Sequence, residues 1–197
     1  MKKILLILVL AIIVPLVYLI INNYNNVPKL DEDVKEKWSQ VQNQYKRRAD
    51  LIPNLVATVK GYAEHEKGTF VEVTEARSKV SQMNINADTL NNPAAMQQFA
   101  NAQAGLSSAL SKLMLVVEKY PDLKANENFM ALQSQLEGTE NRITVARKDF
   151  IESVKRYNTE LRTMPGKLVA AIVHPSAEVK ETFKASVAEQ EAPKVQF

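Results

Sequence analysis

Two histidines are the residues of this chain best suited to acid–base or metal chemistry, and neither stands in a pattern that such chemistry requires. The segment from His65 to Thr69 begins like the helix of a zinc protease, but Thr69 stands where the second histidine ligand would have to be. His174 follows a short apolar stretch and precedes a proline. Because catalytic and metal sites need several convergent groups, we expect no catalytic residue, no metal site and no cofactor.

The other familiar catalytic patterns are absent from the sequence as well. It contains no phosphate-binding loop, no dinucleotide fingerprint, no nucleophile elbow and no Glu-x-x-His pair of the kind that di-iron bundles carry. It also contains no cysteine, so neither disulfides nor thiolate metal sites are available. We therefore expect a protein that is not an enzyme. An enzyme that uses helix carboxylates together with His65 is the less favoured alternative.

Three polar residues, Arg48, Glu66 and Gln103, stand in rows of otherwise apolar residues. A charge inside a helical bundle must be paired, so a buried Arg48 needs an acidic partner. The candidates on the last long helix are Glu137, Glu140 and Asp149. Alternatively, the row drifts around the helix and leaves the guanidinium in water, because the helical repeat is 3.6 residues and not 3.5. For Glu66 we favour this second, solvent-exposed interpretation.

Apolar residues repeat every seven positions through most of the chain, which predicts amphipathic α-helices. The first such stripe runs from residue 34 to residue 80, and Pro53 lies inside it. Proline removes a backbone hydrogen bond and bends a helix. Because the stripe keeps its phase past Pro53, we expect one long kinked helix. A true break at Pro53 or near Gly68 is the alternative.

Two further helices have clear start and stop signals. Asn92 and Pro93 combine a capping side chain with proline at the first helical position, and this second helix should end near Tyr120. Either Asp122 or Asn126 can cap the third helix. The third helix should stop at the sequence Met-Pro-Gly of residues 164–166.

These stripes and short connections predict an all-α fold, an antiparallel up-and-down bundle of three long helices with a fourth helix expected. We assign the bundle to residues 25–166. Residues 167–197 should hold a short apolar patch, Leu168–Val173, followed by a mobile tail. The patch could pack back on the bundle as the fourth helix.

The first 24 residues predict a membrane anchor. Lys2 and Lys3 precede an uninterrupted apolar run from Ile4 to Ile21, whose length as a helix is roughly 27 Å, at the low end of what crosses a hydrocarbon core. Lysines ahead of such a run favour a cytoplasmic N-terminus. Residues 1–24 are thus predicted to form a cytoplasmic N-terminus and single transmembrane helix, with the bundle on the extracytoplasmic side.

The charge pattern argues against nucleic acid as a partner. The formal net charge is only +3 in 197 residues, and acidic and basic residues alternate along the helices instead of forming a basic face. At the C-terminus, Val195 and Phe197 place apolar side chains beside a free carboxylate, a form that can add a strand to a PDZ-type groove. A frayed end without a binding role is the more common alternative.

Several blocks of the sequence resemble the LemA family. The first covers most of the chain from Trp38 to Glu66, and the second runs from Glu118 to Ile143, so that the resemblance extends from the anchor to about residue 165. Past Met164 the chain departs from the family, which usually continues with a hydrophobic and aromatic stretch; here Lys167 to Val173 replaces it.

The resemblance implies a bacterial single-pass membrane protein with a four-helix up-and-down bundle and no established enzymatic activity. Relatives of this family include magnetosome-membrane proteins, and the family is associated with envelope maintenance and membrane proteases. We therefore expect a non-enzymatic interaction or scaffold module of the bacterial envelope, with an envelope protease as one candidate partner. A homo-oligomeric membrane organiser is the alternative, for which Phe70, Val71 and Val116 could form a second apolar face.

If a protein docks on the bundle, the polar block beside Pro53 is the surface we favour. It contains Arg47, Arg48, Asp50 and Asn54. The same block has a purely structural interpretation, because a proline kink leaves carbonyl groups without donors and Asn54 or Arg47 could supply them.

Overall fold

The computed structural model of the protein describes residues 2–83, 86 and 90–183. Within these ranges all regular secondary structure is helical, which confirms the all-α fold class. The chain divides into two compact units that are described one at a time. Unit 1 consists of Met1–Ser39 and Lys148–Lys180, and unit 2 of Gln40–Arg147 and Glu181–Phe197.

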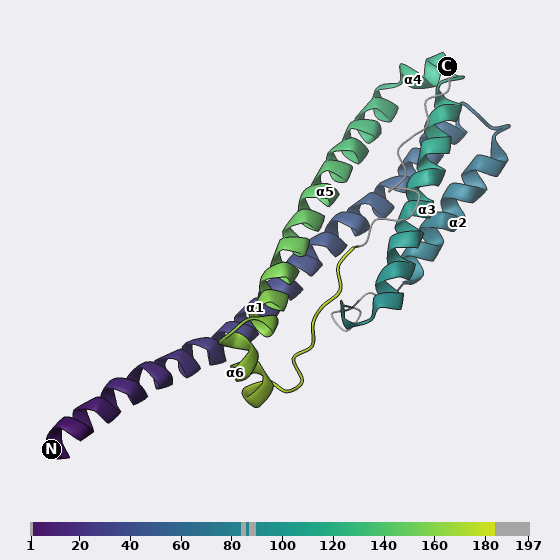
Figure 1. Ribbon diagram of the computed structural model, residues 1–197. Helices are drawn as coiled ribbons and strands as arrows, with labels where there is room; N and C mark the ends of the chain where they lie inside the picture. The colour runs from purple at the N-terminus through teal and green to yellow at the C-terminus, as the bar shows by residue number, and fades with distance from the viewer. Residues whose placement is uncertain (1, 84–85, 87–89, 184–197) are drawn as a thin grey trace, which may run out of the picture. The chain divides into compact units, whose positions relative to one another are not determined.

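Figure 1 shows the helices in chain order, from the purple N-terminus to the yellow end of the described chain. Their bounds are α1 Lys2–Lys60, α2 Lys67–Gln82, α3 Pro93–Val117, α4 Pro121–Lys124, α5 Glu127–Arg162 and α6 Gly166–Val173. Helices α1 and α5 each contribute one part to unit 1 and another part to unit 2.

The first apolar stripe is not one helix, so the favoured prediction was wrong. Helix α1 continues through Pro53 and ends at Lys60, and α2 begins at Lys67, which agrees with the alternative of a break near Gly68. Backbone hydrogen bonds from Ala63 N to Val59 O and from Glu66 N to Ala63 O, both 3.0 Å, shape the turn. The stripe keeps its phase across this turn because both helices bury the same kind of apolar row against one core.

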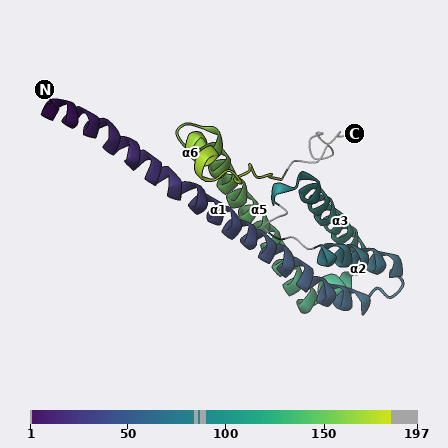
Figure 2. The ribbon, with the colours of Figure 1, turned by 90° about the horizontal axis from the view of Figure 1, so that it is seen from below.

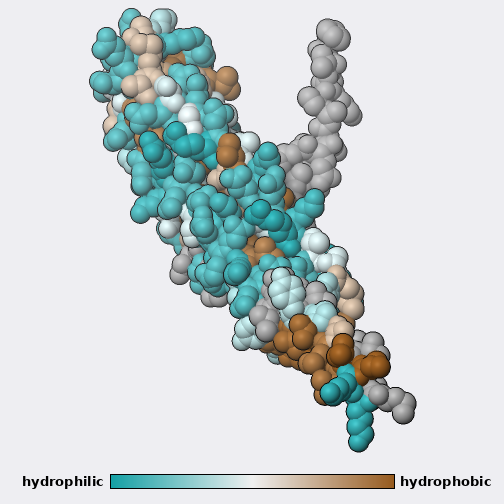
Figure 3. Space-filling view, turned by 90° about the vertical axis from the view of Figure 1, so that its left-hand side faces the viewer, coloured by the Kyte–Doolittle hydropathy of each residue, from teal (hydrophilic) through white to brown (hydrophobic). Residues whose placement is uncertain are grey.

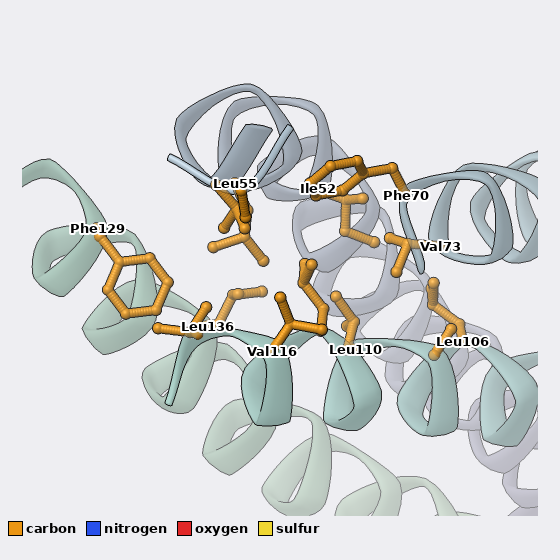
Figure 4. Packing of buried hydrophobic residues seen from close by; sticks show 14 of the residues in the cluster. Ile52, Leu55, Phe70, Val73, Leu106, Leu110, Val116, Phe129 and Leu136 are labelled. Atoms are coloured by element: carbon orange, nitrogen blue, oxygen red, sulfur yellow. The ribbon is translucent and has the colours of Figure 1, made fainter. Parts of the chain in front are cut away.

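Unit 2 is an up-and-down arrangement of four helical segments: the C-terminal part of α1, then α2, α3 and the N-terminal part of α5. Helices α2 and α3 lie side by side in both ribbon views (Figures 1 and 2). All four segments contribute apolar side chains that point toward one another in Figure 4. The labelled ones are Ile52, Leu55, Phe70, Val73, Leu106, Leu110, Val116, Phe129 and Leu136.

The fourth segment of this arrangement therefore comes from the break after Lys60, and not from the apolar patch near the C-terminus. The predicted helix caps are confirmed. Asn92 Oδ1 accepts a hydrogen bond from Ala95 N at 3.1 Å at the start of α3. Of the two candidates before α5, Asn126 is the cap, since its Oδ1 accepts from Phe129 N at 3.1 Å. These caps satisfy backbone donors that a helix start leaves free.

In unit 1, the N-terminal part of α1 runs antiparallel to the C-terminal part of α5. The rings of Trp38 and Phe150, both buried, lie 5.0 Å apart between centroids. Nearer the end of the pair, Arg156 Nη2 lies 2.7 Å from Asp33 Oδ2. The apolar patch forms α6, as expected for a short helix, with Val169 and Ala170 buried.

Part of the predicted tail makes specific contacts. Asn158 exchanges two hydrogen bonds of 2.9 Å with the backbone of Lys180, and Lys180 Nζ lies 2.8 Å from Asp31 Oδ1. Residues 184–197, with the candidate C-terminal ligand residues Val195 and Phe197, lie outside the described residues.

In the part of the chain that the structure covers, no helix is both long and apolar enough to qualify as a membrane-crossing helix, so the predicted transmembrane anchor is not confirmed. The predicted boundaries after residues 24 and 166 stay predictions.

Candidate functional site

Arg48 of unit 2 is a polar group with several hydrogen bonds, and α1 directs it into the bundle with only 2% of its side chain exposed. Its Nη1 donates to Glu140 Oε1 and to Ser107 Oγ, each at 2.9 Å. Its Nη2 donates to the side-chain oxygen of Gln103 and, at 3.4 Å, to the backbone carbonyl of the same residue. Arg48 is thus buried, and Glu140 is its acidic partner among the three candidates.

This cluster also explains why Gln103 interrupts an apolar row of α3: its side-chain oxygen receives the guanidinium. A buried charge that bonds to α3 and α5 at once fixes the register of α1 against both helices, a common use of buried polar groups. Glu66 lies instead at the edge of the bundle, 29% exposed and 3.9 Å from Lys119 Nζ, in agreement with the solvent-exposed interpretation.

A pocket of about 320 Å³ adjoins the Arg48 cluster. Hydrogen-bonding side chains from three helices line it, and Phe183 of the C-terminal segment lies at it with its ring 4.5 Å from the guanidinium carbon of Arg147. Burial raises the pKa of Tyr45, against a lowering effect of Arg147 and Arg48. The Tyr45 phenol is therefore neutral at ordinary pH and serves as a hydrogen-bonding group, not as a base.

The predicted partner surface separates into two kinds of residue. Arg47, Asp50 and Asn54 are exposed, and their spacing of three and four residues puts them on one face of α1. Among the described residues, none of these three side chains forms a hydrogen bond or an ion pair. Arg48 does not belong to this surface, because its side chain points into the bundle.

A groove of about 400 Å³ lies next to this face of α1, in unit 2. Lys46 and Asp50 are its charged residues, and Val80, Met83 and Phe99 contribute apolar groups from the neighbouring segments. An apolar depression with a charged rim is the usual composition of a site that accepts a side chain of another protein.

The structural interpretation of Arg47 and Asn54 was wrong. Pro53 has no N–H, so the carbonyl of Ala49, four residues earlier, lacks its helical donor. Arg77 of α2 supplies it, with Nε 2.8 Å from Ala49 O. Arg47 and Asn54 are therefore not needed to complete the helix.

Neither histidine stands at a catalytic constellation. His65 is exposed in the turn between α1 and α2 of unit 2. His174, in unit 1, has Nε2 3.0 Å from the carbonyl oxygen of Tyr24. Over the described residues, no three His, Cys, Asp or Glu side chains gather into a group that could hold a metal ion.

The apolar face suggested for self-association is not present as predicted. Phe70 and Val116 are buried in the core of unit 2, and only Val71 is exposed. The reason is that the inner faces of the helices are wider than the two heptad rows: α2 buries Phe70 together with Val73 of the row, and α3 buries Val116 together with Val117 of the row.

The described architecture is that of an all-helical protein built around an up-and-down bundle with a buried arginine that bonds to two neighbouring helices. Comparison with known proteins places it in a family: the LemA family profile matches residues 37–197, and the chain belongs to the LemA family.

Among curated proteins, the chain is similar to magnetosome protein MamQ 2 of Paramagnetospirillum magneticum, with 24% identity over 81% of this chain and 65% of that protein. It is also similar to magnetosome protein MamQ of Magnetospirillum gryphiswaldense, with 26% identity over 76% of this chain and 61% of that protein. Protein LemA of Metamycoplasma hominis is 22% identical over 74% of this chain and 63% of its own length. The chain therefore spans less than two thirds of the length of each relative.

Proposed function

We propose that this protein is a non-enzymatic, membrane-anchored binding module of the bacterial cell envelope. In this proposal a partner protein docks on unit 2 at the face of α1 formed by Arg47, Asp50 and Asn54, which we call the α1 face. The alternative of a homo-oligomeric organiser loses support, since two of the three residues suggested for it are buried.

The observation that carries the proposal is the contrast between neighbouring residues of α1. Arg48 is bonded to Ser107, Glu140 and Gln103 and serves the fold. Arg47, Asp50 and Asn54 are exposed, and within the described chain their side chains bond to nothing. A partner can therefore form contacts with these side chains without breaking any hydrogen bond of the bundle. The neighbouring groove offers an apolar depression for a side chain of the partner.

Exposed apolar side chains support the anchor. Along the first turns of α1, the apolar residues whose side chains are described are exposed, and they include Ile4, Ile7, Leu10 and Val14. Figure 3 shows apolar side chains gathered at this end of α1. A helix that exposes apolar residues without a polar face is costly in water and is stable in lipid.

Lys2 and Lys3 favour an N-terminus in the cytoplasm, which would place unit 2 outside the cytoplasmic membrane. An envelope protease is then a candidate partner.

Site-specific photo-cross-linking in intact cells tests the proposal. A photoreactive amino acid replaces Lys46, at the rim of the groove, in the wild-type background and in the variant Arg47→Ala, Asp50→Ala, Asn54→Ala. A matched control carries Glu75→Ala, Ser78→Ala and Lys79→Ala on the exposed side of α2. Arg48 is left unchanged because its loss would disturb the fold.

The expected result is one cross-linked partner, which the α1-face variant loses and the α2 control keeps. Binding of the purified partner to the purified full-length protein should weaken at least tenfold in the first variant, since truncation of a few central residues commonly costs about 2 kcal/mol or more. Equal binding by all three forms would exclude the α1 face. Cross-links only to a second copy would favour the homo-oligomer.

A further inference from the structure

We infer that α6 is a second membrane contact, which lies on the lipid surface beside the point where α1 enters the membrane. This inference rests on the proposed function, because it takes the N-terminal part of α1 as the anchor. All the contacts that carry it lie within unit 1.

The first observation is an exposed apolar stripe with no partner in the described chain. Leu168 and Ile172 are four residues apart, so they share one side of α6. Met164 precedes them in the turn before the helix. The exposed fractions of Met164, Leu168 and Ile172 are 64%, 54% and 79%. The opposite side of α6 is packed, since Val169 and Ala170 are buried. The helix is therefore held by one face and presents apolar groups on the other.

The second observation is a contact between the end of α6 and α1. Pro28 lacks an N–H, so the carbonyl of Tyr24 has no donor four residues ahead of it in α1. His174, directly after α6, lies with Nε2 3.0 Å from this carbonyl oxygen, and the two rings are 5.4 Å apart between centroids. Since a carbonyl only accepts, Nε2 carries the proton and donates it to this bond.

Tyr24 lies three residues beyond the apolar run that ends at Ile21, which is about 4.5 Å of helix rise. The end of α6 is thus tied to α1 within one turn of the proposed anchor. Tyr24 is itself half-exposed, as expected for a tyrosine at a membrane interface. Ile172, two residues before His174, therefore lies near the end of the segment that the anchor would place in lipid.

The charges beside the stripe favour anionic lipid as its occupant. Lys167 precedes Leu168 and is exposed, Arg162 is exposed at the end of α5, and Lys29 is exposed on α1 just past Tyr24. An apolar face flanked by basic residues binds in the plane of the interface, with its apolar groups about 5–10 Å into the boundary between headgroups and acyl chains. Leu168 and Ile172 are exposed together on one side of the helix, and neighbouring exposed apolar groups mark protein or membrane interaction sites.

Fluorescence quenching in vesicles tests this contact. The chain has no cysteine, so single cysteines can be placed at Val14, at Ile172 or at Leu115, an exposed apolar residue of α3 that serves as the control. Each full-length variant carries an environment-sensitive dye and is reconstituted into vesicles of phosphatidylethanolamine and phosphatidylglycerol. Doxyl lipids then quench from a position near the headgroups or near the chain ends.

The expected result is quenching of the dye at position 172 by the doxyl group near the headgroups, quenching at position 14 by the deeper one, and neither at position 115. Adding Leu168→Gln should reduce the quenching at position 172, and adding Met130→Gln on unit 2 should leave it unchanged. If position 14 is quenched and position 172 behaves like position 115, the inference on α6 is overturned while the anchor stands. If position 14 is not quenched, the anchor itself is wrong, and quenching at position 172 then decides the α6 contact separately.

Discussion

Arg77 of α2 donates from Nε to the backbone carbonyl oxygen of Ala49 in α1, at 2.8 Å. This is the carbonyl that Pro53 leaves without a helical donor. A side chain from the neighbouring helix thus replaces the missing backbone hydrogen bond and lets α1 continue to Lys60. Unit 1 has a similar contact: Pro28 leaves the carbonyl of Tyr24 without a helical donor, and His174 bonds to that carbonyl oxygen.

The first prediction is a thermodynamic coupling between Arg77 and Pro53. Arg77→Ala should destabilise the protein by about 1–2 kcal/mol, because it leaves a buried carbonyl unsatisfied. In a Pro53→Ala background, Arg77→Ala should destabilise the protein by about 1 kcal/mol less. The reason is that an alanine at position 53 has a backbone N–H that can donate to the carbonyl of Ala49. The measurement is thermal unfolding of the four forms of the full-length protein in detergent by circular dichroism. Equal costs in both backgrounds would show that Arg77 contributes only by packing.

The second prediction applies the same logic to unit 1. His174→Phe keeps a ring against Tyr24 but removes the donor, so α6 should become less protected. Hydrogen exchange followed by mass spectrometry should show faster exchange in residues 166–173, and Pro28→Ala should reduce that effect because it restores a backbone donor to the carbonyl of Tyr24. His65→Phe, in the exposed turn after α1, is the control and should leave this exchange unchanged. Faster exchange that Pro28→Ala does not reduce would argue against the hydrogen bond.

The third prediction separates two adjacent arginines. Arg48→Ala should cost about 2–4 kcal/mol, somewhat below the usual value for breaking a buried pair, because half of the Glu140 side chain is exposed and can regain water. For a chain of this size each kcal/mol lowers the unfolding midpoint by about 2–4 °C. Arg47→Ala is the matched control and should change the free energy of unfolding by less than about 0.5 kcal/mol. A comparably small effect of Arg48→Ala would rule out the buried pair.

The fold class, the helix caps and the need of Arg48 for an acid could all be predicted from the sequence, because each depends on local spacing or on a single rule. The chain reversal after Lys60 could not be predicted in the same way. Val59, Val73 and Val80 keep the heptad count across it, so the pattern is the same for one long helix and for two helices that face one core. Only the six-residue turn between Lys60 and Lys67 distinguishes the two cases.

The candidate site was predictable to a smaller degree. Sequence alone cannot distinguish Arg47 from Arg48, since a rotation of about 100° around the helix axis decides which one is buried. Arg77 was missed although a signal exists: each proline inside a helix marks a carbonyl four residues earlier that needs an outside donor. The identity of that donor depends on tertiary packing, as does the choice of Glu140 over Glu137 and Asp149.

The fourth prediction concerns two glycines. A Cβ added at Gly166 would overlap the backbone oxygen of Glu160 and lie 2.7 Å from its Oε1, whereas a Cβ at Gly105 would meet nothing within 4 Å. Gly166→Ala should therefore destabilise by about 1–3 kcal/mol. Gly105→Ala, inside α3, should stabilise by about 0.5–1 kcal/mol. Thermal unfolding of both variants shows whether each substitution stabilises or destabilises the protein. A stabilising Gly166→Ala would contradict the close approach of α6 to the end of α5.

The fifth prediction is a loss of stability in acid that depends on Asp31. Burial alone raises the pKa of Asp31, but hydrogen bonds from Lys180 and Lys35 outweigh it and hold the pKa below its ordinary value. A folded-state pKa below the unfolded one stabilises the protein at every pH above the unfolded value, about 3.9, and this contribution disappears as the pH falls through the folded value. Hydrogen bonds to Asp31 and Glu32 raise the pKa of Lys35, so this lysine stays charged over the whole pH range and does not contribute to the loss of stability in acid.

Asp31→Asn should therefore be less stable than the wild type at neutral pH, and the difference should shrink once the pH drops below about 4. Unfolding midpoints of the wild type, Asp31→Asn and the exposed control Glu152→Gln, measured from neutral pH into acid, test this. The control should follow the wild type over the whole range, because its carboxylate is exposed to water. A difference between Asp31→Asn and the wild type that stays constant down to the lowest pH would show that Asp31 is not held in its charged form by Lys180 and Lys35.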